Sequence, residues 1–91
     1  MQARLLEKFH KQRFEAEKAG LWEQWGIVIN PVTYQELLKE AYERVDAMPI
    51  SFSNGLDYLY GLRVIVRNFV PEEEAYIVDE QFGRWILQQP N

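Results

Sequence analysis

Residues 25–37 constrain this chain most, because they combine the signals of a strand, of its end and of a helix start. Ile27, Val28 and Ile29 form a β-branched run, which packs well on the pleated surface of a sheet. Pro31 cannot donate to a β-ladder, so we expect strand pairing to end before it. The segment therefore predicts a short buried strand that leads directly into a helix.

This helix is predicted to run from residue 33 to residue 48. Thr33 and Glu36 have the spacing of a capping box, and Val32 and Leu37 are placed to form a hydrophobic staple around it. Pro49 ends the pattern, since the residue before a proline is disfavoured in the α conformation. Apolar residues recur at intervals of three and four, as on one helix face: Tyr34, Leu37, Leu38, Ala41, Tyr42, Val45 and Met48.

A longer helix of mixed charge is predicted over residues 2–19, and Gly20 is expected to end it. Oppositely charged residues such as Glu7 and Lys11 stand four positions apart, which stabilises a solvated helix. Its apolar positions are sparse, so we expect it to bury little against its own domain and to remain partly free. A sparse amphipathic helix followed by two tryptophans resembles an interface, and its candidate partner-binding residues are Leu5, Leu6, Phe9, Trp22 and Trp25.

The C-terminal half has the pattern of β-strands. Asn54-Gly55 is a strong turn signal. After a loop around Pro71, we expect strands over residues 75–78 and 84–87, with a turn at 79–83 between them. Another strand is predicted where two sets of residues alternate and face opposite ways, Leu62, Val64 and Val66 against Arg63, Ile65 and Arg67.

Together these elements predict an α+β fold. We expect a small, mainly antiparallel sheet of three to four strands packed on one helix, with the long N-terminal helix beside it. Residues 1–91 should form a single domain, with a helical segment at 1–25 and an α+β core at 26–91. The apolar face of residues 33–48 should meet the sheet at Leu62, Val64, Val66 and Ile77.

Composition excludes several classes of function. The chain has 91 residues, of which 47% are hydrophobic, a formal charge of −4 and no cysteine. Without cysteine there is no disulfide, no thiolate metal site and no cysteine nucleophile. The negative charge disfavours a nucleic-acid partner. Neither a signal-peptide pattern nor a run of membrane-spanning length is present, so we expect a cytoplasmic protein with no membrane partner.

No residue pattern predicts catalysis or metal binding. His10 is the one histidine and lies on a solvated helix face with no nucleophile beside it. The glutamates at 72–74 lack the alternating spacing of a calcium loop, and Asp79 and Glu80 fall in a predicted turn. We expect a non-enzymatic chain with no catalytic residue, no metal site and no cofactor.

An arginine-bearing sheet face is the alternative site. Arg63 and Arg67 share one strand face, and Arg84 is on a strand that we expect to lie nearby. Such a face binds RNA or single-stranded DNA when aromatic rings stand between the charges, a role open to Tyr76 and Trp85. The same arginines can instead face solvent or pair with the glutamates of the adjoining loop.

The strand-to-helix junction also carries a family resemblance. Residues 26–34 read G-I-V-I-N-P-V-T-Y, and Leu37 and Leu38 follow. This string resembles the "G-I-V-hydrophobic-N-P-x-x-[W/Y]-x-x-L" segment in the axial domain of tailed-phage major capsid proteins.

Later strings resemble the same family in the same order. Residues 59–66 are similar to its "hydrophobic–G–L–P–V–V–V" strand, except that Arg63 stands where the family usually has proline. Residues 70–71 and 75–79, together with Phe82, resemble the continuation "M/V–P–x–G–x–hydrophobic–G–D–F". The resemblance covers residues 26–87 and implies a reduced, capsid-like module.

We therefore expect a non-catalytic protein–protein interaction protein, a phage-type structural or assembly module that binds a protein partner or forms a homo-oligomer. The resemblance implies a location in the host cytoplasm or in the virion. The alternative is a small nucleic-acid-binding or transcription-modulating protein that uses Arg63, Arg67 and Arg84.

Overall fold

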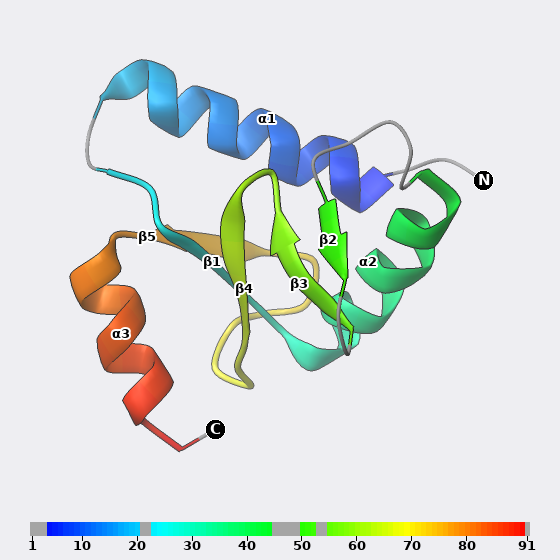
Figure 1. Cartoon of the computed structure of the whole chain (residues 1–91). Coiled ribbons are helices and arrows are strands. Elements are labelled where there is room, and N and C mark those ends of the chain that lie inside the picture. Colours follow the sequence, from blue (N-terminus) through cyan, green and yellow to red (C-terminus); the bar gives the residue numbers. More distant parts are fainter. Residues whose placement is uncertain (1–3, 21–22, 45–49, 53–54, 91) are drawn as a thin grey trace.

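The computed structural model describes residues 4–20, 23–44, 50–52 and 55–90 (Figure 1). In chain order its elements are α1 (Arg4–Ala19), β1 (Gly26–Ile29), α2 (Pro31–Arg44), β2 (Ile50–Phe52), β3 (Leu56–Leu59), β4 (Leu62–Val66), β5 (Ala75–Val78) and α3 (Glu80–Gln88). Several positions used in the sequence predictions lie outside the described residues, namely Trp22, Val45, Met48, Pro49 and Asn54.

The strands form one mixed sheet in the order β2-β3-β4-β1-β5. β1 pairs in parallel with β4 and antiparallel with β5, whereas β3 pairs antiparallel with both β2 and β4. The α+β class and the mainly antiparallel sheet are thereby confirmed. In the part of the chain that the structure describes, the sheet has five strands rather than three or four, because residues 50–52 and 56–59 form two further short strands.

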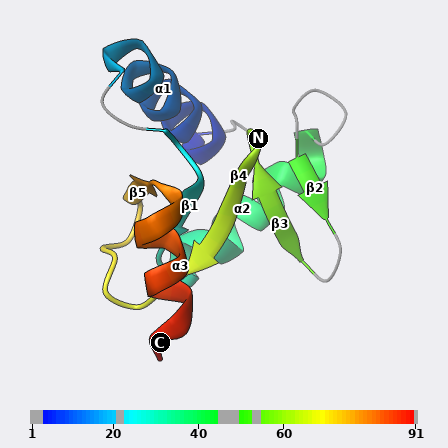
Figure 2. The same ribbon diagram turned by 60° about the vertical axis from the view of Figure 1, so that its left-hand side comes forward.

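α1 and α2 cover one face of the sheet, and α3 packs on the opposite face (Figures 1 and 2). Strand residues alternate between the two sides. On β4, Leu62, Val64 and Val66 join the cluster beneath α1 and α2, while Ile65 joins the cluster beneath α3. Ile77 of β5 belongs to the α1–α2 cluster. The alternation predicted for this strand is confirmed. The packing predicted for the second helix is confirmed at Leu37, Leu38 and Ala41, whereas Tyr42 is 62% exposed and does not face the sheet.

β1 is buried on both faces. Ile27 and Ile29 contact the α1–α2 cluster, and Val28 contacts the α3 cluster. A strand between two neighbours and two helix layers has no solvent side, so a continuous apolar run replaces the usual alternation. The β-branched run therefore marks the centre of the sheet.

α2 begins earlier than the sequence pattern suggested. Asn30 is the residue that caps it, since its Oδ1 accepts from the amide of Val32 at 2.8 Å. Its carbonyl accepts from Tyr34 N, also at 2.8 Å. Pro31 then occupies the first helical position, where a missing N–H removes no hydrogen bond. The helix thus starts at Pro31 rather than at residue 33.

The predicted capping box is therefore wrong. Thr33 Oγ1 accepts from the amide of Glu73 at 2.7 Å, and Glu36 pairs with Arg4. Val32 is half exposed, so it does not close a staple. Thr33 and Glu36 have the spacing of a capping box, but Asn30 already caps the first turn, and Thr33 lies inside the helix.

The predicted turn at 79–83 and strand at 84–87 are also wrong, because these residues form α3. Asp79 caps this helix, with its carboxylate accepting from Phe82 N at 2.8 Å. Gly83 lies inside the helix and allows close packing, since a Cβ there would approach the Trp25 ring to 2.4 Å. The glycine thus marks a helix contact and not a turn.

α1 ends at Gly20 as predicted, with the glycine in the left-handed conformation at φ 64°. The expectation that this helix is partly free is wrong at its N-terminal end. Leu5, Leu6 and Phe9 are each 0% exposed and belong to the chain's own core. Three large side chains from less than one and a half turns are sufficient to dock the helix on the sheet.

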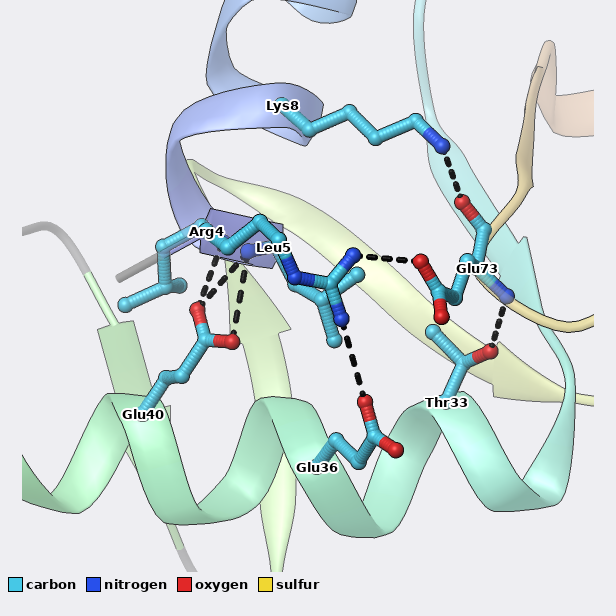
Figure 3. Close-up of polar contacts among 8 residues, drawn as sticks. Arg4, Leu5, Lys8, Thr33, Glu36, Glu40 and Glu73 are labelled. Atoms are coloured by element: carbon cyan, nitrogen blue, oxygen red, sulfur yellow. Dashed lines mark hydrogen bonds and ion pairs between the residues drawn. The ribbon is translucent and has the colours of Figure 1, made fainter. Parts of the chain in front are cut away.

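A buried carboxylate fixes the start of α1 (Figure 3). Glu40 on α2 is only 7% exposed, and it accepts from Leu5 N at 2.9 Å and from Leu6 N at 3.0 Å. These amides belong to the first turn, where a helix has no internal acceptor for them. A negative charge at this end also interacts favourably with the helix dipole. Glu40 thus caps a helix that lies far away in sequence.

Exposed charges surround this cap. Arg4 pairs with Glu36 and with Glu73, and Lys8 donates to the carbonyl of Glu73 (Figure 3). The hydrogen bond from Arg4 to the Glu73 carboxylate raises the pKa of Arg4. α1, α2 and the loop before β5 are thereby linked by polar contacts at one end of the molecule.

We predict that Glu40→Ala lowers the free energy of unfolding by about 2 kcal/mol, because it leaves two buried amides without an acceptor. Urea denaturation followed by circular dichroism measures the change. Glu43→Ala alters an exposed carboxylate of the same helix and should change stability by less than about 0.5 kcal/mol. Equal losses in the two variants would contradict the capping role.

Candidate functional site

His10, Asp79 and Glu80 have positions that account for them structurally. His10 is exposed and its ring lies 4.8 Å from the ring of Tyr60. Asp79 caps α3, and Glu80 pairs with Arg84. Within the described ranges, no group of three histidine, cysteine or acidic residues is arranged to hold a metal ion. In the same residues, no helix combines the length and apolarity needed to cross a membrane.

Three of the five residues predicted for a partner surface, Leu5, Leu6 and Phe9, belong to the core instead. Leu5, Leu6 and Phe9 lie on the side of α1 that faces the sheet, and they offer no exposed area to a partner. Trp22 lies outside the described residues, and Trp25 is half-buried against α3. The sequence pattern of this helix predicts a partner surface because the sequence alone does not show how closely α1 packs on the sheet.

One pair of exposed aromatic side chains lies on α3. Phe82 and Trp85 are 50% and 54% exposed, and their rings stack with centroids 5.7 Å apart. The helix contacts the sheet through Gly83 and Ile86, which are buried. Residues three apart are neighbours on a helix surface, so the two rings form one continuous apolar area beside the core-facing side. A shallow hollow of 320 Å³ is lined by Asp79, Gln81, Phe82 and Trp85.

A second aromatic pair lies at the edge strand β5. Tyr76 is 43% exposed and stacks on Phe69 with a centroid distance of 6.4 Å. Tyr76 is in register with Val28 of β1, whose side chain faces α3, so both pairs are on the same side of the sheet. We call Phe69, Tyr76, Phe82 and Trp85 the β5–α3 surface.

The arginines predicted for nucleic acid are only partly brought together. Arg63 lies over the rings of Trp25 and Tyr58, at 4.8 and 5.5 Å from their centroids. Arg84 lies 5.6 Å from the same Trp25 ring, although it is on a helix and not on the predicted strand. Both arrangements have the geometry of cation–π contacts.

Arg67 has a different role from the other two arginines. Its guanidinium donates to Val66 O at 2.7 Å and to Ile86 O at 3.3 Å. Ile86 O, in the last turn of α3, also accepts from Gln89 N at 3.0 Å, so Arg67 adds a second donor there, where a cation is favoured by the helix dipole. Arg67 therefore holds α3 on the sheet and does not extend the patch formed by Arg63 and Arg84.

We predict that Gly83→Ala destabilises the protein even though alanine is the better helix former. The gain in helix propensity is about 1 kcal/mol, whereas a Cβ 2.4 Å from the Trp25 ring overpacks the contact. Overpacking costs about 1–3 kcal/mol, so the net effect should be a loss of stability. Thermal unfolding measures it, with Gln81→Ala on the exposed side of α3 as the control. A Gly83→Ala protein more stable than the parent would contradict this packing.

Comparisons with protein-family models, curated proteins and solved structures find no match to this chain. The resemblance to phage capsid proteins therefore stays a prediction. The sequence patterns predict Tyr76 and Trp85 as possible stacking residues but place Trp85 on a strand, so they do not predict its stacking with Phe82 on α3. The signal that could have found it is Asp79 followed by Glu80 and Gln81, which is a helix-start pattern.

Proposed function

We propose that this chain is a non-catalytic protein–protein interaction protein and that its β5–α3 surface binds the partner. The observation that carries the proposal is the stacked, half-exposed pair of Phe82 and Trp85. Exposed aromatic rings are unfavourable in water, and tryptophan is enriched among the residues that dominate binding energy. A partner that covers the two rings would bury most of their remaining apolar area.

The support beneath the rings favours the same function. α3 is capped by Asp79 at its start, packed on Trp25 through Gly83, and bonded by Arg67 near its end. A helix fixed at three points presents its aromatic rings with little conformational freedom left to lose. Binding to such a pre-organised surface costs less entropy than binding to a mobile one.

The phage assignment forms a narrower part of this proposal. We propose a structural or assembly module of a tailed phage on the basis of the strings at residues 26–34, 59–66 and 75–79. In the fold these strings correspond to β1 with the start of α2, to β4, and to β5. They therefore include the centre of the sheet and the edge that adjoins the proposed surface.

Peptide selection tests the binding function. Random peptides selected on the whole protein should bind it with a blue shift of tryptophan emission as Trp85 is covered. Their affinity should fall by about tenfold or more in Trp85→Ala, because a central aromatic contact is lost. Phe14→Ala removes an equally exposed aromatic from α1, at 61% exposure, and should leave affinity within about twofold. Peptides that bind the Trp85→Ala protein as tightly as the parent would contradict the proposal.

Nucleic-acid binding is the second candidate, favoured by the contacts of Arg63 with two aromatic rings, Trp25 and Tyr58. Among the ion pairs of the described residues, none involves Arg63, so its charge remains available to a phosphate. If this function is correct, an oligothymidine should bind with an affinity that falls steeply with salt. Arg63→Glu should weaken it about tenfold, while Lys39→Glu on exposed α2 should have less than about a twofold effect. An unchanged affinity in Arg63→Glu would exclude this site.

A further inference from the structure

β5 is an edge of the sheet, and within the described residues only β1 pairs with it. The carbonyl of Ala75 points away from β1, because it accepts a hydrogen bond from Gln12 Nε2 of α1 at 2.8 Å. Backbone groups of alternate residues in an edge strand point the same way, so the amide and carbonyl of Ile77 also point away from β1. Among the described residues, Gln12 occupies the outward carbonyl of Ala75, while the outward amide and carbonyl of Ile77 have no partner.

A hollow adjoins this part of the edge. It is a shallow depression open to solvent, with a volume of 420 Å³, and is lined by Ile77, Val78, Asp79 and Phe82. An extended peptide that pairs with a sheet edge uses its backbone for affinity and places alternate side chains in such hollows for specificity. The hollow and the outward backbone of Ile77 thus combine the features of a strand-addition site.

Carboxylates stand at both ends of β5. Glu72 and Glu74 are exposed just before the strand, and neither forms an ion pair in the portion of the chain described. Asp79 and Glu80 follow the strand directly. A second copy of the chain, pairing antiparallel through β5, would place the acidic ends of the two strands beside one another. Like charges in that position are destabilising, which argues against self-pairing and in favour of a basic partner.

We propose that an extended basic segment of a partner protein, with apolar residues alternating with lysine or arginine, adds to β5 as a further strand. Its backbone pairs with Ile77, one apolar side chain enters the hollow beside Phe82, and its cations face Glu72 and Glu74. This inference rests on the proposed protein-binding function and names the chemistry of the partner.

The test uses the full chain and three short, end-blocked peptides. One alternates lysine with valine, one alternates lysine with proline, and one alternates glutamate with valine. The lysine–valine peptide should bind and slow hydrogen exchange of the Ile77 amide by about tenfold or more, as ladder pairing requires. The lysine–proline peptide has the same charge but cannot supply a full ladder, so it should bind at least about tenfold more weakly. The glutamate–valine peptide should not bind.

A matched pair of variants tests whether the carboxylates beside β5 contribute to peptide binding. Glu74→Lys should weaken binding of the lysine–valine peptide by about five- to tenfold at low salt. Glu43→Lys makes the same charge change on α2 and should have an effect of less than about twofold. Equal effects of the two variants would show that only net charge matters and would overturn the proposed site.

Other outcomes separate this inference from the proposed function. Equal binding of the lysine–valine and lysine–proline peptides, or no protection of the Ile77 amide, would overturn strand addition. So would a dimer in sedimentation whose Ile77 amide is already protected without peptide. If selected peptides depend on Trp85 but leave Ile77 unprotected, the binding function holds and the strand inference fails. If selected peptides do not depend on Trp85, the proposed function itself fails.

Discussion

The burial of β1 on both faces is the constraint on which the rest of the structure depends. Ile27 and Ile29 pack against the layer formed by α1 and α2, while Val28 packs in the cluster beneath α3. One strand of four residues therefore holds helices on both sides of the sheet. A polar side chain at any of these three positions would be buried without a partner, which costs more than the strand can recover from its hydrogen bonds.

Polar contacts then fix how the helices sit on this apolar centre. Glu40 caps α1 from α2, and Glu73 connects the loop before β5 to both helices through Arg4 and Thr33. On the opposite face, Arg67 bonds the end of α3. Burial of apolar area has no preferred direction, so these directional contacts decide the orientation of each helix.

The proposed function follows from how α3 is held. Its buried side is narrow, since Gly83 and Ile86 make the contact with the sheet, and its aromatic residues are left outside the core. The same strand edge that leads into α3 carries the hollow and the flanking carboxylates of the proposed strand-addition site. Both proposals thus place the partner along one border of the molecule, where β5 and α3 meet.

The sequence by itself determined the elements whose pattern is local. The β-branched run predicted β1, the alternation predicted β4, and the three- and four-residue spacing predicted most of α2. It could not determine which stretch caps which helix, because Glu40 and Leu5 meet only after folding. For residues 80–88 the sequence contains conflicting signals, because Asp79, Glu80 and Gln81 form a helix-start pattern while residues 84–87 resemble a strand. The close contact of Gly83 with Trp25, which holds this helix on the sheet, forms only on folding. The candidate site was decided by tertiary structure, since exposure of Phe82 and Trp85 depends on which side of α3 faces the sheet. The periodicity of a helix or strand and the residues that cap it can be read from the sequence. Which element each apolar face packs against depends on contacts between segments distant in the chain.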